Sequence, residues 1–302
     1  MTGAGLGSGA AAAVVIINPA AGPARRGAPA ERVAIATRIL ERARLPYRVQ
    51  LTERPNHAYD LAGAAVEEGA TLVIAWGGDG TINEVAQALV FTGASLGLVP
   101  GGSGNGLARE LKIPFDPERA IERALAPSER RLDVGEISGR MFFNVAGIGL
   151  DAKVAFDVAA FRNPRGLRPY VMASARELVS YFPCEYAIDS DAGSLRASAL
   201  VVAVANSRQY GYAALVAPLA VMDDGLLDVV VIEGRSFVGN VVRLPSLFTG
   251  GFHKRSGVTT LKVREVRVRA NTRMLFHVDG EVIEGERELV ARVHAGALRV
   301  RA

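Results

Sequence analysis

The sequence predicts an α/β domain with a parallel sheet, followed by a mostly antiparallel β domain. Two observations predict this order. Up to about Arg131, apolar segments of strand length alternate with amphipathic helical segments, a pattern typical of parallel α/β sheets. After that point, β-rich segments follow one another in hairpins. A chain of 302 residues is long enough for two domains, which we expect at residues 1–131 and 132–302.

The N-terminal part begins with an apolar strand that ends at Asn18-Pro19, a pair that favours turns. Asn56 and Gly69 are suited to cap the second helix, and Pro117 suits the first turn of the last one. The expected strands are 12–17, 47–53, 70–76 and 95–100, and the expected helices are 28–45, 56–69, 81–90, 104–113 and 116–125.

The C-terminal part contains mainly segments of alternating or continuous apolar character. Asp224-Gly225, flanked by apolar segments, predicts a tight hairpin within 214–234. Two helical insertions are expected, at 168–182 and 236–249. The other expected β segments are 131–137, 140–149, 184–190, 194–206, 263–271, 273–283 and 288–302.

Composition and charge exclude several classes of protein. The formal net charge of +4 comes without a dense Lys/Arg block, so nucleic acid is not an expected partner. Cys184 is the single cysteine, which rules out an intrachain disulfide and fits a reducing cytoplasm. The first nine residues read as a flexible tail rather than a signal peptide, and no apolar run is long enough to span a bilayer.

Two glycine-rich loops follow consecutive predicted strands. The first is Gly77-Gly78-Asp79-Gly80-Thr81, and the second runs from Pro100 to Gly106 as PGGSGNG. Ligands of open α/β sheets bind beyond the carboxyl ends of strands, and glycines let backbone N–H groups approach an anion. Together the loops predict a cradle for a polyphosphate. The alternative is a pair of turns with helix caps.

Two other nucleotide-binding patterns fit the sequence less well. The P-loop pattern G-x-x-x-x-G-K-[ST] is absent. Residues 147–152 (GIGLDA) match G-x-G-x-x-A, but they lie in the β-rich part. We interpret them as a structural turn that leads into a helix.

The motifs GGDGTINEV (77–85) and PGGSGNGLARE (100–110) together resemble the diacylglycerol kinase catalytic family, which also includes sphingosine and ceramide kinases and bacterial soluble lipid kinases. Further matches occur in the same order along nearly the whole chain. They are INPAAG (17–22), RLDVGEI (131–137), NVAGIGLDAKV (144–154), DDGLLDVVVI (223–232) and HVDGE (277–281).

The resemblance implies an N-terminal nucleotide-binding domain, a C-terminal β-sandwich, and an ATP site in the cleft between them. ATP and Mg²⁺ are the expected cofactors, and a lipid hydroxyl is the expected phosphate acceptor. The residues that the resemblance assigns to ATP are Asn18, Pro19, Thr52, Gly77, Gly78, Gly80, Thr81, Asn83, Gly101, Gly102, Ser103, Asn105 and Asp279.

Mg²⁺ prefers oxygen ligands, and phosphoryl transfer to an alcohol needs a proton acceptor. Asp79, Asp133 and Asp279 are the expected Mg²⁺ ligands, directly or through water. In an extended segment, Asp279 and Glu281 would share a face; the alternative for Asp279-Gly280 is a plain hairpin turn. The resemblance favours Glu281 as the base, while its sphingosine kinase branch favours Asp79 for contacting the substrate hydroxyl.

The sequence departs from the family at Gly106, where many bacterial members have an aspartate. One carboxylate of the usual network is therefore missing, and GSGN is closer to the sphingosine kinase form.

Asp223 and Asp224 either serve a hairpin turn or, by resemblance, hold a structural Mg²⁺. The four histidines (His57, His253, His277 and His294) lack metal-ligand spacing and are expected to be structural or surface residues.

A lipid kinase must reach a substrate held in a bilayer. The segment 156–182 carries aromatic side chains among arginines and either contacts a membrane surface or packs as a core helix with solvated arginines. We therefore expect a cytoplasmic protein, transiently peripheral at the membrane and compatible with a homodimer. The alternatives are a NAD kinase, which also carries GGDGT, and a non-catalytic lipid- or nucleotide-binding protein.

Overall fold

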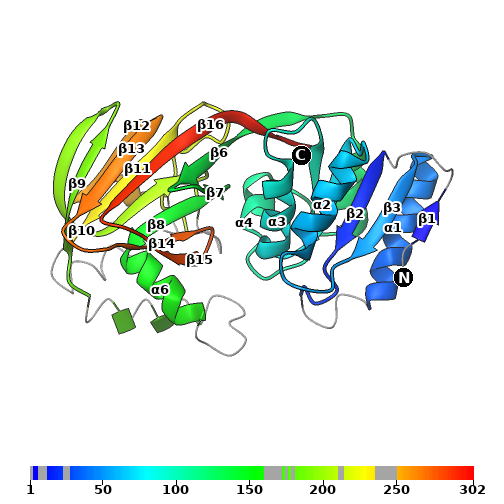
Figure 1. Cartoon of the computed structure of the whole chain (residues 1–302), viewed down its shortest axis with the longest axis horizontal. Coiled ribbons are helices and arrows are strands. Elements are labelled where there is room, and N and C mark those ends of the chain that lie inside the picture. The colour runs from blue at the N-terminus through cyan, green and yellow to red at the C-terminus, as the bar shows by residue number, and fades with distance from the viewer. Residues whose placement is uncertain are drawn as a thin grey trace. The chain divides into compact units, whose positions relative to one another are not determined.

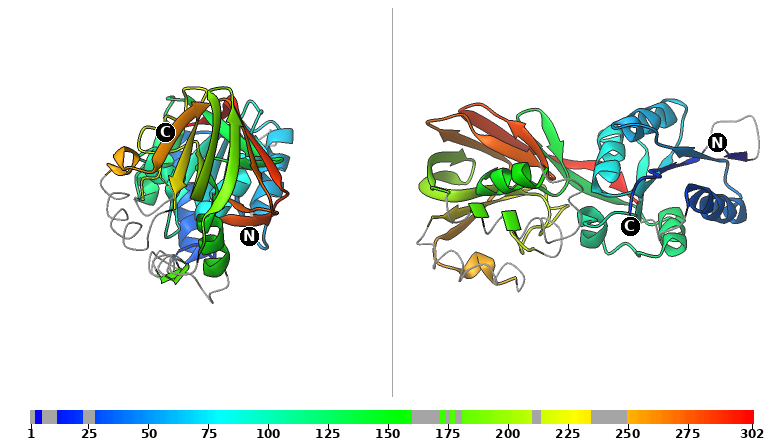
Figure 2. Two further views of the ribbon diagram at one scale, coloured as in Figure 1. Left: turned by 90° about the vertical axis from the view of Figure 1, so that its left-hand side faces the viewer. Right: turned by 90° about the horizontal axis from the view of Figure 1, so that it is seen from below.

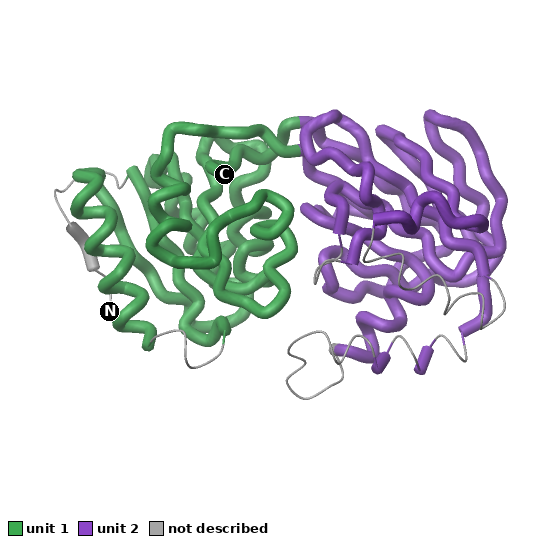
Figure 3. Tube along the Cα trace, turned by 180° about the vertical axis from the view of Figure 1, so that it is seen from behind, with its two compact units in different colours: residues 1–132, 296–302 green, residues 133–295 purple. Residues whose placement is uncertain are grey.

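The computed structural model describes residues 3–5, 12–22, 28–159, 172–173, 176–177, 181–209, 214–234 and 250–302. The chain forms two compact units, shown in different colours in Figure 3. Unit 1 comprises Met1–Leu132 and Gly296–Ala302, and unit 2 comprises Asp133–Ala295. The chain passes into unit 2 within one strand, Arg130–Ile137, and returns within another, Glu288–Val300.

Unit 1 is built around a parallel sheet with the strand order β3-β2-β4-β5 (Figure 1). A short strand pairs antiparallel with β3, and the end of β16 (Glu288–Val300) pairs parallel with β5. The strands are β1 (Gly3–Gly5), β2 (Ala13–Ile17), β3 (Tyr47–Leu51), β4 (Leu72–Gly77) and β5 (Ser95–Pro100).

Helices cover both faces of this sheet, and every residue of β2, β4 and β5 is buried as a consequence. Helix α1 packs beside α5, and α2 packs beside α3 (Figures 1 and 2). The helices are α1 (Pro29–Ala43), α2 (His57–Glu67), α3 (Asp79–Leu89), α4 (Gly106–Glu110) and α5 (Pro117–Leu125).

The predicted elements of unit 1 are therefore present, with one correction at a helix cap. Asn56 precedes α2, but its φ of 61° is left-handed and its side chain makes no capping bond. Glu84 of α3 accepts the N–H groups of Asn56 and Ala58 instead, at 3.1 and 3.0 Å. A carboxylate from a neighbouring helix thus satisfies the first-turn amides that a local cap would otherwise bind.

Unit 2 is mostly antiparallel. Most of its strands contribute to one large apolar cluster, and residues of β8, β10 and β11 contribute to a second. The long strand β10 pairs with β9 along its first half and with β8 and β11 along its second half. The elements are β6 (Arg130–Ile137), β7 (Arg140–Phe142), β8 (Val145–Gly149), α6 (Leu150–Ala159), β9 (Cys184–Ser190), β10 (Gly193–Ala205), β11 (Leu227–Glu233), η1 (Phe252–Lys254), β12 (Val258–Val263), β13 (Glu265–Ala270), β14 (Leu275–Val278), β15 (Glu281–Glu284) and β16.

The hairpin predicted at Asp224-Gly225 is wrong. Only its second half is a strand, β11, which pairs with β10 and β12. The residues before Asp224 form turns, with one isolated bridge between Gln209 and Leu215. The helix predicted at 236–249 and most of the one predicted at 168–182 lie outside the described residues.

Candidate functional site

The carboxyl ends of β2, β4 and β5 lie level with one another. Ile17, Trp76 and Val99 form one row across the sheet, because Ile17 pairs with Trp76 and Trp76 with Val99. Asn18, which follows β2, donates its backbone N–H to the carbonyl of Trp76 at 2.9 Å. The loops that follow the three strands therefore begin side by side at one edge of the sheet.

The two glycine loops contact each other backbone to backbone. The N–H of Gly101 donates to the carbonyl of Gly77 at 2.7 Å. A Cβ atom added to Gly102 would lie 2.6 Å from the Cα atom of Gly78, closer than real Cβ contacts. Glycine at position 102 is therefore required for the observed distance between the loops.

Asp79 joins the first loop to the second. Its Oδ2 accepts the N–H of Asn105 at 2.8 Å, and its Oδ1 accepts the N–H of Gly106 at 2.6 Å. A Cβ atom on Gly104 would lie 2.6 Å from Asp79 Oδ2, so the loop fits around this carboxylate only with glycine there. Each oxygen keeps a second lone pair, and the Mg²⁺ and hydroxyl roles of Asp79 stay predictions.

Asn105 closes the second loop on itself. Its side chain is buried and pairs with the backbone of Gly102, accepting the N–H and donating to the carbonyl, each at 2.9 Å. Its φ of 55° is left-handed, which asparagine tolerates better than most residues. Ser103, at the tip of the loop, is exposed.

The loop after β2 is tied to the first glycine loop by one side-chain bond. Asn18 Nδ2 donates to Thr81 Oγ1 at 2.8 Å, and Thr81 is buried in the first turn of α3. Thr52, which follows β3, donates its N–H to the carbonyl of Ile17 at 2.9 Å. The structure thus brings Asn18, Thr52 and Thr81 to the strand ends, with Pro19 half-buried after Asn18.

Asn83 accepts a hydrogen bond from Gln87 one turn later on α3, at 2.5 Å.

Arg32 of α1 was not predicted as a site residue. It is buried, and its guanidinium donates to the carbonyls of Asn18 and Ala21 at 3.0 and 2.8 Å. A charged residue among the apolar positions of a predicted helix was the signal that could have identified it.

Asp133 lies in unit 2 and is buried. Its Oδ2 accepts the N–H of Gly225 at 2.7 Å, while its own N–H donates to the carbonyl of Met222 at 2.7 Å. These bonds hold the 222–225 turn, which explains why Gly225 is not part of a hairpin. The Mg²⁺ role of Asp133 stays a prediction.

Asp224 lies beside a lysine ammonium. Lys262 Nζ is 2.7 Å from Asp224 Oδ2 and 3.2 Å from Asp228 Oδ2. Burial raises the pKa of Asp228, although Lys262 opposes the rise. Burial lowers the pKa of Lys262, but the two carboxylates outweigh this effect and raise it overall. Asp223 is exposed, and the structural Mg²⁺ expected at Asp223 and Asp224 stays a prediction.

Asp279 and Gly280 form the two-residue turn between β14 and β15. Their φ angles are 49° and 94°, both left-handed, as in the turns typical of tight hairpins. Asp279-Gly280 is therefore a hairpin turn and not an extended segment that aligns Asp279 with Glu281, while the functional roles of both acidic residues stay predictions.

The carboxylate of Asp279 anchors this turn to the start of β8. It accepts N–H groups from Phe143, Asn144 and Val145 at 2.8, 2.9 and 3.0 Å. Burial raises the pKa of Asp279, and the three amide donors oppose that rise. Glu281, at the start of β15, is exposed. Its backbone pairs with Val278 of β14, while its side chain makes no hydrogen bond or ion pair with the other residues that the structure describes.

Within the described part of the chain, no group of three or more His, Cys, Asp or Glu side chains is arranged to hold a metal ion. Of the predicted Mg²⁺ ligands, Asp79 belongs to unit 1, and Asp133 and Asp279 belong to unit 2. Oxygen ligands of this kind suit Mg²⁺ when phosphate oxygens complete its coordination. The predicted magnesium site stays a prediction.

Each of the four histidines has a local partner, as a structural role predicts. His57 Nδ1 accepts the N–H of Glu53, and His253 Nδ1 contacts the carbonyl of Gly250 at 3.1 Å. His294 Nε2 lies 2.7 Å from Glu136 Oε2, and His277 Nε2 lies 3.4 Å from Asp151 Oδ2.

The GIGLDA segment is a strand-to-helix junction, as we interpreted it. β8 ends at Gly149, whose φ of 95° turns the chain directly into α6. A Cβ atom on Gly149 would lie 2.5 Å from the carbonyl oxygen of Leu200, so glycine is needed for the approach of β10 as well.

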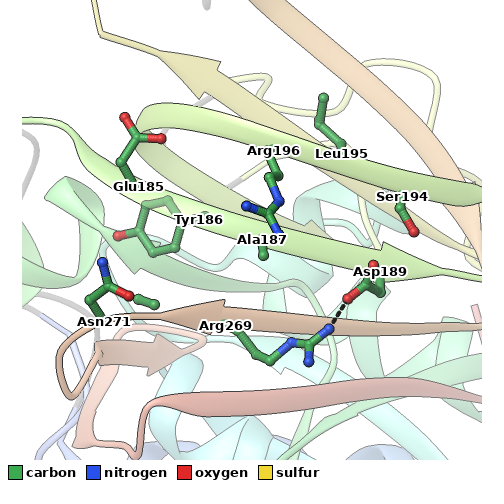
Figure 4. A pocket seen from close by; sticks show the side chains of 10 residues that line it. Glu185, Tyr186, Ala187, Asp189, Ser194, Leu195, Arg196, Arg269 and Asn271 are labelled. Atoms are coloured by element: carbon green, nitrogen blue, oxygen red, sulfur yellow. Dashed lines mark hydrogen bonds and ion pairs between the residues drawn. The ribbon is translucent and has the colours of Figure 1, made fainter.

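A cavity of about 570 Å³ lies on unit 2, and none of the predicted site residues lines it (Figure 4). In the sheet, Ala187 of β9 pairs with Arg196 of β10 and Arg269 of β13, so a small residue stands between two arginines. Arg269 pairs with Asp189, and Glu185 also lines the cavity. The two positive and two negative charges balance, which argues against a phosphate site here.

Several large apolar side chains of unit 2 are exposed. Phe156, Met172 and Phe182 have exposed fractions of 52%, 64% and 85%. Tyr181 instead packs against the core, and residues 160–171 lie outside the described part. No helix among the described residues is long and apolar enough to cross a membrane.

Comparisons with known proteins agree with the motifs. Residues 12–137 match the diacylglycerol kinase catalytic domain, and residues 144–302 match the YegS C-terminal NAD kinase beta sandwich-like domain. A probable lipid kinase YegS-like protein of Pseudomonas aeruginosa is 31% identical over 256 residues, 83% of this chain and 83% of that protein. The chain belongs to this lipid kinase family. A diacylglycerol kinase of Bacillus subtilis is 29% identical over 241 residues, 76% of this chain and 79% of that protein.

Solved structures of the family share the fold. A putative diacylglycerol kinase from Bacillus anthracis superposes with a TM-score of 0.80 at 20% identity, covering 95% of each chain. A diacylglycerol kinase structure from the same organism gives a TM-score of 0.74 at 18% identity, again covering 95% of each chain. The family-model matches and the curated relatives confirm the predicted family and enzyme class, and the solved structures confirm the predicted fold class.

Proposed function

We propose that this chain transfers the γ-phosphate of ATP, with Mg²⁺, to a hydroxyl of diacylglycerol or a sphingoid-like lipid. The assembly of strand-end loops in unit 1 carries this proposal. The N-cap of α3 is Gly78, which has no side chain to satisfy the first-turn amides. Asp79 bonds to the second loop instead. The amino end of α3 is therefore suited to bind phosphate oxygens.

Helices α2 and α5 do not offer their first turn in this way, whereas α1 and α4, like α3, have no side-chain capping bond at their N-caps. The side chain of Asp116 accepts the N–H of Arg119 at 3.0 Å and caps α5. Glu84 takes the same role for α2. The contrast favours a ligand at α3, where glycines also remove the side chains that would block a phosphate chain.

We assign the base to Glu281 and the loop-joining role to Asp79. Both oxygens of Asp79 accept backbone N–H groups of the second loop, which holds the carboxylate in one position. Glu281 is exposed, follows a rigid turn and is open to a substrate hydroxyl. Asp79 would then be one of the residues that hold Mg²⁺, which would neutralise phosphate charge, and Glu281 would accept the proton of the substrate hydroxyl.

The exposed side chains of Phe156, Met172 and Phe182 support contact with a lipid surface, because apolar groups of this size favour leaving water. We propose that the protein binds the membrane transiently in this way. Cytoplasmic location and a homodimer remain predictions.

A radiolabelled ATP assay on a panel of lipid extracts, with NAD as the control acceptor, tests the proposed activity. The match to a domain described as NAD kinase beta sandwich-like makes NAD the necessary control. Label in a lipid and not in NAD is the expected result. Label in NAD alone would support the NAD kinase alternative, and no label with retained ATP or lipid binding would support a non-catalytic protein.

A further inference from the structure

Asp151 and His277 meet over a glycine of β8. His277 of β14 pairs with Gly147 in the sheet, and Asp151 lies in the first turn of α6. A Cβ atom on Gly147 would lie 1.8 Å from Asp151 Oδ2 and 2.6 Å from His277 Nε2. The absence of a side chain at Gly147 is therefore what allows the two groups to come together.

The imidazole of His277 contacts α6 on one side and the β14–β15 turn on the other. Nε2 lies 3.4 Å from Asp151 Oδ2, and Nδ1 accepts the N–H of Gly280 at 3.3 Å. Because Nδ1 accepts, the proton of the neutral ring is on Nε2, where it faces the carboxylate. The ring is buried, so its orientation is fixed by these contacts and by packing.

Gly280 is the residue that precedes Glu281. On the other side of Gly280, the carboxylate of Asp279 is held by three backbone amides of the strand start. The turn is thus fixed at both of its residues, by Asp279 and by His277. The side chain of Glu281 is exposed, and its backbone pairs with Val278 across the hairpin, so this pair and the turn together set its position.

We propose that His277, oriented by Asp151, is a positioning residue for Glu281, and this inference rests on the proposed function. A general base must lie within hydrogen-bond reach of the proton it accepts. A displacement of about 1 Å at a reacting group can cost on the order of 10²-fold in rate. The contact from His277 Nδ1 to the Gly280 amide limits such displacement.

Two substitutions separate the contacts of the ring. His277→Asn places an amide oxygen near the position of Nδ1 and keeps an acceptor for the Gly280 N–H. His277→Gln reaches toward Asp151 instead and loses that acceptor, while it retains most of the side-chain volume. We expect kcat to fall on the order of 10²-fold in His277→Gln, to recover largely in His277→Asn, and KM for ATP to stay unchanged in both.

His294→Gln is the matched control. His294 Nε2 also lies beside a carboxylate in unit 2, at 2.7 Å from Glu136 Oε2, but on β16, a strand that pairs with β5, β6 and β13 and not with β14 or β15. Its kcat should equal that of the wild type. Wild-type kcat in His277→Gln, in an enzyme that phosphorylates lipid, would overturn the inference.

Amide hydrogen exchange at Gly280 provides a readout besides activity. Exchange should be faster in His277→Gln than in the wild type and His277→Asn, because only the Gln variant lacks the acceptor. Equal exchange in all three would overturn the inference. A wild-type protein that phosphorylates no lipid would instead refute the proposed function, and the exchange rates would still decide whether His277 holds the turn.

Discussion

Gly102→Ala tests whether the close approach of the two glycine loops matters. An added Cβ atom would lie 2.6 Å from the Cα atom of Gly78, and ordinary contact begins at 3.4 Å. The obstructing atom is backbone, so the loops must separate by about 0.8 Å. Overpacking of this kind typically costs about 1–3 kcal/mol of stability. A shift of about 1 Å at a phosphate-binding loop can lower the rate on the order of 10²-fold.

Gly63→Ala is the control for this variant. Gly63 lies in the middle of α2, and an added Cβ atom there meets nothing within 4 Å. Replacing a helical glycine by alanine should stabilise the protein by roughly 0.5–1 kcal/mol. Chemical denaturation and ATP titration of both variants measure the two effects. Wild-type stability and ATP affinity in Gly102→Ala would refute the argument that the loops need this approach.

Three further predictions concern acidic side chains. Asp79→Ala should abolish phosphoryl transfer and leave the fold intact; full activity would remove Asp79 from the mechanism. Glu281→Gln should lower kcat on the order of 10²- to 10⁴-fold, because it removes the proposed base. The melting temperature should not change, because the side chain is exposed, and a large loss of thermal stability would contradict this prediction. Burial raises the pKa of Glu136, but donors from His294 and Arg292 outweigh it and lower the pKa below the ordinary 4.5. The stability that Glu136 contributes is thus complete above pH 4.5 and is lost as the pH falls through its folded-state pKa. The difference in unfolding free energy between the wild type and Glu136→Gln, measured by denaturation, should therefore shrink in that pH range. A difference that does not depend on pH would contradict this prediction.

The strand-end loops could be predicted because the chemistry is local. Apolar runs of similar length, such as β4 and β5, pair in register and are buried on both faces, so the loops that follow them share one edge. The bonding of Asp79 could not be predicted, because its acceptor bond to Asn105 joins residues 26 positions apart. Glycine content alone does not show which glycines provide space for a carboxylate and which for another strand.

The two Asp-Gly pairs show where local turn signals fail. Asp279-Gly280 forms a hairpin because the segments on both sides, β14 and β15, pair with each other. Asp224-Gly225 has the same sequence, but β11 pairs with β10 and β12, and the N–H of Gly225 donates to Asp133. The dipeptide permits the turn, and the pairing of distant strands decides whether a hairpin results.

The departure at position 106 has a limited structural effect. The group that Asp79 binds there is the backbone N–H of Gly106, at 2.6 Å, and every residue except proline has this donor. Glycine in place of the aspartate that many bacterial members have thus keeps the joint between the loops while it removes one negative charge. If Mg²⁺ binds beside these loops as proposed, fewer carboxylate oxygens attract it, and more of its ligation falls to Asp79 and the phosphates.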